Sequence, residues 1–338
     1  MTESRFRMPA EWEPQSATWA SWPHNLETWP DNLTDAQNEF VEFVTLIASK
    51  QPVNIMAPAS QHDLCRSCFS DQPNVHLLNI ETNDAWARDY APTFVHDANT
   101  NQIASIDWHY NAWGGKYPPY DADQKVANQV AKHLGIENIS GQLCFEGGGL
   151  EVNSQGVLLT TESCLLHANR NSDLTRAAAE KILQQNLGCT QIVWLPGDVG
   201  SEEALPGDDT DGHIDQLARF TSDNTIVHAW VETEDRRHAA LKANLAALSQ
   251  QLPDTSLIPL RLPPEFEFRD RQIPASYCNF LITNDHLIVP QFGFEEDELA
   301  LQTLAPLFPN RKIMGLSSRH LSVGLGSFHC LSQQQPAT

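Results

Sequence analysis

The chain has 338 residues, of which 41% are hydrophobic and 19% charged, the composition of an ordinary globular protein with a substantial core. No stretch reaches the roughly 20 apolar residues of a membrane-spanning helix, and Met1–Met8 has no apolar segment of a secretion signal. The formal net charge of −22 argues against nucleic acid and anionic membranes as partners and favours cations.

The seven cysteines are scattered along the chain from Cys65 to Cys330. An odd number of cysteines spread over a long chain is not a disulfide framework, so we expect a reduced, cytoplasmic protein. Cys65 and Cys68 have C-x-x-C spacing, but no second pair and no suitably spaced histidines accompany them. We therefore expect neither a zinc site nor a redox site there.

The N-terminal part of the chain alternates between predicted strands and helices. A strand ends at Pro23, and Thr34 is a candidate N-cap for an amphipathic helix with apolar residues at helical spacing. The expected order is strand 16–22, helix 34–48, strand 53–57, short helix 61–69 and strand 75–80.

The rest of the chain repeats a hairpin, a helix and a strand at intervals of roughly 50–65 residues, which suggests about five similar units in a ring or stack. The predicted helices lie near 123–134, 173–187, 234–252 and 295–307. The predicted hairpins pair 143–151 with 157–161, 213–220 with 225–231, and 277–283 with 286–290. Single strands are expected at 191–195, 256–262 and 311–316. No linker interrupts residues 1–338, so we expect a single domain, with a short polar tail within 330–338.

An acidic stretch, Asp208–Asp215, opens one of the predicted strands. Residues two apart on a strand share a face, so His213 and Asp215 are expected to point the same way. Asp208–Asp211 could be a solvated turn without a role. His213 and Asp215 could ligate a metal, or His213 could move protons while Asp215 holds a cationic group.

A second motif runs from Asn83 to Pro92, where proline favours an extended chain. On a strand, Asp84, Trp86 and Arg88 would share one face, with Asp89 on the other face or in a turn. Arg88 could simply form an ion pair with Asp84 or Asp89. Alternatively, Asp89 and Trp86 could enclose a flat cation, where coulombic and cation–π attraction reinforce each other.

Glycine clusters occur at Gly147–Gly149 and, beside an aromatic residue, at Trp113–Lys116. Three glycines in a strand-like run indicate close approach of the backbone to another group. A lone cysteine such as Cys330 is more often a buried small apolar residue than a nucleophile. Together, however, a thiol, an imidazole, carboxylates and tryptophans suit nucleophilic attack on a planar guanidinium.

Several of these stretches, in order and with compatible spacing from Met8 to Pro336, resemble the agmatine deiminase family, which includes the bacterial-type peptidyl-arginine deiminases. The stretches that carry the resemblance are Asn83–Pro92, Trp113–Lys116, Glu146–Gly149, Thr160–Asn171, Asp209–Asp215, Ala275–Asn279 and Gly324–Gln334.

The resemblance implies the pentein fold, a five-bladed α/β propeller of ββαβ units around a central site, with no metal or organic cofactor. It also implies a role for each of eight residues: Cys330 as the nucleophile, His213 as the general acid and base, Glu146 orienting the histidine, Asp89 and Asp215 holding the guanidinium, Trp86 and Trp113 lining the pocket, and Asn279 beside the nucleophile loop.

Departures from the family pattern leave the substrate less defined than the reaction. Leu325 and Ser327 replace a glycine and an asparagine, Glu151 replaces a histidine, and Gln216–Arg219 replaces a segment with asparagine and cysteines. We expect a small cationic guanidinium substrate, agmatine. Peptidyl-arginine or free arginine is the alternative, with Arg88 or Arg219 binding its carboxylate. A metal-dependent hydrolase, a polyamine-binding protein and a homo-oligomer also remain open.

Overall fold

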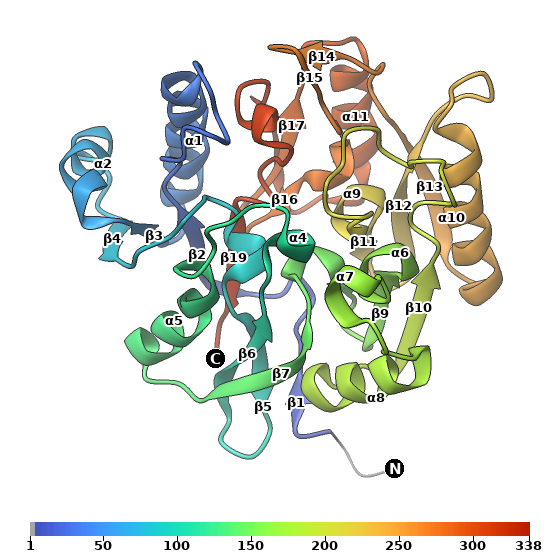
Figure 1. The fold of residues 1–338 in the computed structure, drawn as a ribbon, viewed down its shortest axis with the longest axis horizontal. Coiled ribbons are helices and arrows are strands. Elements are labelled where there is room, and N and C mark those ends of the chain that lie inside the picture. The colour runs from blue at the N-terminus through green and yellow to red at the C-terminus, as the bar shows by residue number, and fades with distance from the viewer. Residues whose placement is uncertain (1–3) are drawn as a thin grey trace.

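Five β-sheets stand in a ring in the computed structural model, which describes residues 4–338 (Figure 1). The colours of Figure 1 follow one another round this ring from blue to red, so the sheets succeed each other in chain order. A small hairpin of β14 (Glu267–Phe268) and β15 (Arg271–Gln272) lies at the rim.

Two sheets have four strands, which are, in spatial order, β19 (Ser332–Pro336), β2 (Gln15–Ser21), β3 (Val53–Ala57) and β4 (Val75–Asn79) in one, and β1 (Phe6–Arg7), β5 (Thr93–Asp97), β6 (Gln102–His109) and β7 (Asn138–Cys144) in the other. Two of the three-stranded sheets consist of β10 (Gln191–Leu195), β9 (Val157–Thr161) and β8 (Glu151–Val152), and of β11 (Ala218–Ser222), β12 (Thr225–Trp230) and β13 (Ser256–Arg261). The last sheet consists of β16 (Leu281–Ile282), β17 (His286–Gln291) and β18 (Lys312–Ser317).

The α-helices are α1 (Leu33–Ala48), α2 (His62–Cys68), α3 (Ala87–Tyr90), α4 (Ala112–Gly115), α5 (Val126–Leu134), α6 (Glu162–Leu165), α7 (Ala168–Asn171), α8 (Arg176–Leu187), α9 (Ile214–Leu217), α10 (His238–Gln251) and α11 (Glu296–Leu304). The 3₁₀ turns are η1 (Ala59–Gln61), η2 (Asp123–Lys125), η3 (Gly147–Gly149), η4 (Tyr277–Asn279), η5 (Ala305–Leu307) and η6 (Leu321–Gly324).

Each of the five sheets combines an antiparallel pair with a parallel strand. In one of them β11 pairs antiparallel with β12, and β13 returns after α10 to pair parallel with β12. The other four sheets repeat this arrangement, and two of them have one further edge strand, β1 or β4. A parallel pair requires a crossover connection, and a helix supplies it in every unit. The expected five-bladed α/β propeller of ββαβ units is therefore confirmed.

The hydrophobic core reaches the C-terminal loop through stacked aromatic rings. Phe40, Phe43 and Ile47 recur at helical spacing on α1 and are fully buried. The Phe43 ring stacks on Phe328 with a centroid distance of 4.8 Å. Burying a phenylalanine contributes about 1.5–3 kcal/mol, so this pair fixes the loop that carries Cys330 to the first unit.

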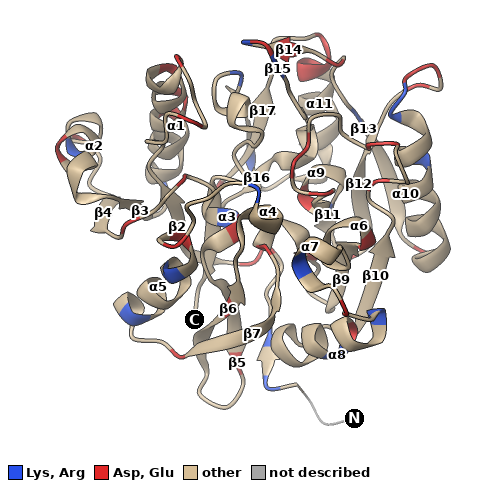
Figure 2. Cartoon of the chain, viewed as in Figure 1, with Lys and Arg blue, Asp and Glu red and all other residues tan. Residues whose placement is uncertain are grey.

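None of the described helices is both long enough and apolar enough to cross a bilayer. Acidic segments occur in every unit and also in the short elements near the centre (Figure 2).

Four segments predicted to be continuous strands each contain a helical turn at or beside a predicted site residue, so these four predictions are wrong in the same way. The strand expected at 83–92 contains α3, and those at 143–151, 213–220 and 277–283 contain η3, α9 and η4. Apolar alternation does not distinguish a strand from such short turns. A strand would place consecutive side chains on opposite faces, and the turns break that alternation.

Two further predictions fail at the ends of elements. Thr34 lies inside α1, whose N-cap is Asn32 and makes no side-chain capping bond. The expected polar tail is β19, which pairs antiparallel with β2 and closes the ring. Gln333 is only 2% exposed, and its amide oxygen, like that of Gln334, accepts from Arg88. These glutamines accept hydrogen bonds from the buried Arg88 guanidinium, a role that composition alone could not reveal.

Candidate active site

The eight residues predicted for the site meet around a cavity of about 500 Å³. Cys330, Asp89, Trp86 and Trp113 line the cavity directly. The remaining four are buried behind these residues and contact one another or the lining residues: Glu146, His213, Asp215 and Asn279.

Cys330 lies in the segment between η6 and β19 and is 4% exposed. Asn279 Nδ2 donates to its Sγ atom at 3.1 Å, and Asp215 Oδ2 lies 3.7 Å from the same sulfur. The backbone N–H of Cys330 donates to Asn279 Oδ1 at 3.3 Å. Burial raises the pKa of Cys330 well above its ordinary value, and the charges of Asp215 and Asp89 raise it further. A cation placed between these groups would reverse part of that shift.

The loop before Cys330 accommodates the two residues that depart from the family pattern. Leu325 adopts left-handed backbone geometry with φ 73°, which glycine takes most readily. The Ser327 hydroxyl lies 2.7 Å from that of Ser318. Between them, a Cβ on Gly326 would lie 2.5 Å from the Trp86 ring, so no larger residue fits.

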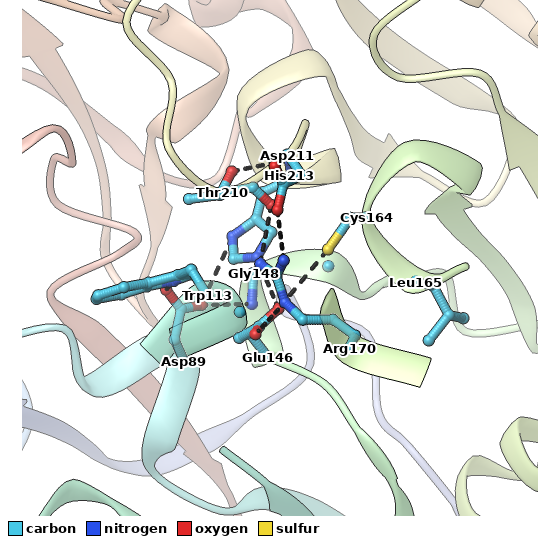
Figure 3. Close-up of polar contacts among 12 residues, drawn as sticks. Asp89, Trp113, Glu146, Gly148, Cys164, Leu165, Arg170, Thr210, Asp211 and His213 are labelled. Carbon is cyan, nitrogen blue, oxygen red and sulfur yellow. Dashed lines mark hydrogen bonds and ion pairs between the residues drawn. The ribbon is translucent and has the colours of Figure 1, made fainter. Parts of the chain in front are cut away.

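His213 immediately precedes α9 and stands between two carboxylates (Figure 3). Its Nε2 atom lies 3.3 Å from Glu146 Oε2, and its Nδ1 atom 3.7 Å from Asp89 Oδ1. Burial opposes the charged ring, but Asp89, Cys164 and Glu146 outweigh it and raise the pKa of His213 well above its ordinary value. His213 is therefore suited to act as an acid at neutral pH.

Asp89 lies in α3, where both of its oxygens accept hydrogen bonds. Trp113 Nε1 donates to Oδ2 at 3.0 Å, and the Gly148 N–H donates to Oδ1 at 2.9 Å. Burial raises the pKa of Asp89 to about 6, with His213 opposing the rise and Asp215 adding to it. The Trp113 backbone is left-handed (φ 55°) within α4, and this turn aims the indole at the carboxylate.

Asp215 lies in the first turn of α9, and its Oδ2 atom is held by two donors. Asn279 Nδ2 donates at 3.2 Å and His329 Nδ1 lies 2.7 Å away. Its Oδ1 atom is buried without a hydrogen-bond partner in residues 4–338. Burial alone would raise the pKa of Asp215, but His329 outweighs it and the pKa lies below its usual value. Because α9 is helical, His213 and Asp215 do not share a strand face.

Glu146 joins His213 to an ion-pair chain that the sequence did not indicate (Figure 3). Arg170 Nε donates to Glu146 Oε1 at 2.8 Å, and Arg170 also forms an ion pair with Asp211. Lys116 Nζ bonds to the other oxygen of Asp211 at 2.9 Å. Burial would raise the pKa of Glu146, but His213 and Arg170 lower it. Asp211 is therefore part of this chain and not of a merely solvated turn.

The triple glycine is explained by the approach of the backbone to the site. A Cβ on Gly148 would lie 2.5 Å from His213 Nδ1 and 2.8 Å from Asp89 Oδ1. Only glycine lets η3 pass between these two side chains, which confirms the expected close approach.

A second group of buried charges lies on the other side of Asp215. His329 Nε2 is 2.9 Å from Glu11 Oε2, and Arg219 bonds to Glu11 at 2.6 Å and to Glu151 at 2.8 Å. Glu151 and Arg219 are two of the departures from the family pattern, and here they are partners. Glu11 was missed because it lies in no motif. His329 adjoins Cys330, and that adjacency was its one available signal.

One cluster of possible metal ligands is found among the described residues, with Glu146, Cys164 and His213 offering atoms within 4.8 Å of one another. The Arg170 guanidinium already occupies Glu146 Oε1, so a second cation there would be repelled. Asp215 is not part of that cluster, and it contacts Asn279 and His329 instead. These residues do not fit the hypothesis of a metal on His213 and Asp215.

Comparisons with known proteins extend over nearly the whole chain. A family model described as Porphyromonas-type peptidyl-arginine deiminase matches residues 7–336. The agmatine deiminase of Stutzerimonas stutzeri (strain A1501) is 34% identical, covering 98% of this chain and 96% of that protein. The agmatine deiminase of Pseudomonas syringae pv. syringae (strain B728a) has the same identity and coverage.

Solved structures of agmatine deiminases also match nearly the whole chain. The agmatine deiminase of Enterococcus faecalis matches with a TM-score of 0.89 and 31% identity, covering 99% of this chain and 98% of that one. A cysteine-to-serine variant of the C. jejuni agmatine deiminase with substrate bound matches with a TM-score of 0.90 and 32% identity, covering 98% and 96%. DDAH from Pseudomonas aeruginosa, at 11% identity and a TM-score of 0.52, shares the fold alone.

Proposed function

The chain belongs to the Porphyromonas-type peptidyl-arginine deiminase family, and we propose that it is a guanidine deiminase converting agmatine and water to N-carbamoylputrescine and ammonia. One observation carries this proposal: a buried thiol and a buried carboxylate line one cavity, and an imidazole and a second carboxylate lie directly behind them at 3.7 Å. They belong to Cys330, His213, Asp89 and Asp215.

The two carboxylates would bind the planar guanidinium of the substrate. Asp89 lines the cavity, and the Oδ1 atom of Asp215 is free to accept an N–H. Charge-assisted hydrogen bonds of this kind are roughly twice as strong as neutral ones. Trp86 and Trp113 also line the cavity and would add aromatic faces beside the cation. Asn279 would hold the sulfur at the guanidinium carbon through its bond to Sγ.

In the first half of the reaction, Cys330 attacks the guanidinium carbon as a thiolate. The substrate cation lowers the pKa of the thiol by offsetting the charges of Asp89 and Asp215. Attack gives a neutral tetrahedral adduct with a new C–S bond. His213 then donates a proton to one nitrogen, the C–N bond breaks and ammonia leaves. The product of this half is a cationic thiouronium on Cys330.

In the second half, His213 is neutral and removes a proton from water, which attacks the thiouronium carbon. The C–S bond breaks, Cys330 leaves as a thiolate, and the ureido product forms. His213 ends this half protonated, as it began the cycle. The hydroxyl proton of the adduct passes to solvent, where the ammonia released in the first half takes it up as ammonium, so atoms and charge balance. Glu146, which bonds to Nε2, would keep the His213 ring oriented throughout.

The charges of the cavity favour agmatine over arginine. Five acidic side chains line it, those of Glu27, Asp84, Asp89, Asp123 and Asp209, against Arg271 as the one Lys or Arg among the described lining residues. Burial raises the pKa of Asp123 well above its ordinary value, so the negative charge rests mainly on the other four. An acidic pocket suits a substrate whose far end is an ammonium.

The two arginines expected to bind a carboxylate are not placed to do so. Neither Arg88 nor Arg219 lines the cavity. Arg88 donates to the His329 carbonyl and to two glutamine side chains, and Arg219 is paired with Glu11 and Glu151. That expectation was wrong, because both guanidinium groups serve to balance buried charge. Arg271 keeps free arginine as the second candidate substrate.

Ammonia release from agmatine, free arginine and an arginine peptide would test the proposal. We expect the highest kcat/KM with agmatine and no loss of activity on treatment with a chelator. If agmatine were the poorest of the three substrates, the assignment would be wrong. Seven free cysteines are compatible with a reducing cytoplasm as the place of the reaction.

A further inference from the structure

His329, the residue before the proposed nucleophile, lies between two carboxylates. Its Nδ1 atom is 2.7 Å from Asp215 Oδ2, and its Nε2 atom is 2.9 Å from Glu11 Oε2. The side chain is 1% exposed, and Asp215 and Glu11 are buried with it. Neither His329 nor Glu11 has a part in the chemistry proposed above.

The geometry defines where the protons are. An ionised carboxylate can only accept hydrogen bonds, so a ring held by two of them needs a proton on each nitrogen. Glu11 also accepts from Arg219 at 2.6 Å and from the Ile282 N–H at 2.7 Å. Asp215 Oδ2 accepts from Asn279 at 3.2 Å. With so many donors, both carboxyl groups fit the ionised form, and the form of His329 that can donate to both of them is the imidazolium.

The neighbouring charges agree with this assignment. Carboxylates and cations alternate in the buried network, with Arg219 between Glu11 and Glu151 and with the Arg88 Nε donating to the His329 carbonyl at 3.2 Å. Asp215 faces Cys330 and, at longer range, His213. His329 is thus the one described group that contacts both Glu11 and Asp215. A neutral ring has a proton on one nitrogen only, so its other nitrogen would set a lone pair against a buried carboxylate, which is costly.

We propose that His329 is a positioning residue whose imidazolium, anchored by Glu11, keeps Asp215 ionised and leaves its Oδ1 atom available for the guanidinium. This inference rests on the proposed function of Asp215 as a guanidinium ligand. Glu11 thereby acts on substrate binding from outside the cavity, through one intervening ring.

Replacing His329 by asparagine tests this role. Asparagine can still donate one hydrogen bond toward Asp215, but it carries no charge and does not reach Glu11. Asp215 would then take up a proton at a higher pH, so the acidic limb of kcat/KM should move upward. We expect KM for agmatine near neutral pH to rise about ten- to a hundredfold with a smaller change in kcat. Glu11→Gln should change KM and the acidic limb in the same direction.

His228 provides a matched control, because it is also buried (4% exposed) and its ring hydrogen-bonds, among residues 4–338, only to the Ala229 carbonyl. His228→Asn should keep the wild-type KM and pH profile once thermal unfolding shows that it is folded. Equal KM and an unmoved acidic limb in folded His329→Asn and Glu11→Gln would overturn the proposal. So would a loss confined to kcat.

Nitrogen-15 NMR of the wild-type protein, with labelled histidines, gives a readout that does not depend on activity. The His329 signals, assigned in the wild-type protein by through-bond correlation to its backbone resonances, should show two protonated ring nitrogens near neutral pH. A single protonated nitrogen would overturn the proposal even if every variant failed to fold. If the wild-type protein released no ammonia from agmatine, the proposed function would fail while this measurement still decided the state of His329.

Discussion

At the scale of single residues, the two aspartates of the site, Asp89 and Asp215, have pKa values shifted in opposite directions. The pKa of Asp89 is raised to about 6, chiefly by burial, whereas that of Asp215 is lowered because His329 outweighs burial. Asp215 thus carries its charge at all pH values of interest, and Asp89 gains its charge near pH 6. Substrate binding should therefore depend on pH through Asp89.

Cys330→Ser should abolish ammonia release while leaving the fold and substrate binding intact. A serine hydroxyl is a far weaker nucleophile than a thiolate, and we expect turnover to fall by at least about a thousandfold. A coupled ammonia assay measures the loss, and calorimetric binding of agmatine shows that the site persists. Undiminished turnover would contradict the thiolate mechanism.

Agmatine affinity of the same Cys330→Ser variant should weaken as the pH falls through about 6. Protonation of Asp89 removes one of the two negative charges that bind the guanidinium, and each further pH unit should cost up to about tenfold in Kd. Calorimetry between about pH 5 and 8 follows this change. Adding Asp89→Asn to this variant should weaken agmatine binding near pH 8 and remove the change in affinity around pH 6. An affinity independent of pH would contradict the assignment.

At the scale of elements, the site depends on short turns inserted where strands were expected. The turns α3, η3, α9 and η4 supply Asp89, Gly148, Asp215 and Asn279. Their boundaries depend on contacts between residues far apart in the chain, such as the Gly148 N–H bonded to Asp89. Local patterns therefore locate such a segment in the chain, and tertiary contacts decide where it turns.

Gly148→Ala should inactivate the enzyme, because the added methyl group would lie 2.5 Å from His213 and 2.8 Å from Asp89. We expect kcat/KM to fall by about a hundredfold or more, since small displacements of reacting groups cost that much. Gly315→Ala is the control, because its methyl group would meet the flexible end of the Gln291 side chain. Similar activity in both variants would show that η3 does not need glycine at 148.

Removal of residues 333–338 should destabilise the protein and abolish activity. The deletion takes away most of β19 and the two amides that bind Arg88. Leaving that guanidinium buried without these partners costs roughly 3–5 kcal/mol. Removing only residues 337–338 loses a single backbone bond to Pro14, about 1 kcal/mol. Urea unfolding of the two truncated proteins compares the costs, and equal stability would mean that β19 is dispensable.

At the scale of the whole molecule, 43 acidic residues against 21 basic ones surround a site that takes a cation. Acidic segments in every unit (Figure 2) make this field general rather than confined to the cavity. Such a field raises the rate at which a cation arrives, and salt screens it within about 10 Å at 0.1 M.

kcat/KM for agmatine should therefore fall about severalfold as salt is raised from roughly 0.01 to 0.2 M, with kcat nearly unchanged. Steady-state ammonia release measures both constants. Free arginine, with one net positive charge against two for agmatine, should give a shallower dependence. Identical slopes for the two substrates would show that the overall charge does not guide binding.

The repeated units and most helix and strand positions could be predicted from the sequence pattern. The eight site residues followed from the family resemblance, and the structure places them close together, while their roles stay a prediction. The repeat came from local periodicity, which short-range packing largely decides. The network of Glu11, His329 and Arg219 could not be predicted, because it joins positions up to 318 residues apart. The same holds for β19, whose glutamines are polar in sequence but buried against Arg88.

The pairing of β19 with β2 also has a consequence for how the chain folds. Thr18 pairs with Gln334, so the sheet that begins with β2 near the N-terminus is completed by the last strand described. Contacts between residues so far apart in the chain form slowly, because the entropy of closing a large loop is lost before the contacts contribute stabilising free energy. Until then the edge of β2 is open to other chains. The nucleophile loop acquires its shape only in this closing step, so partly folded molecules carry Cys330 without its partners and should be catalytically silent.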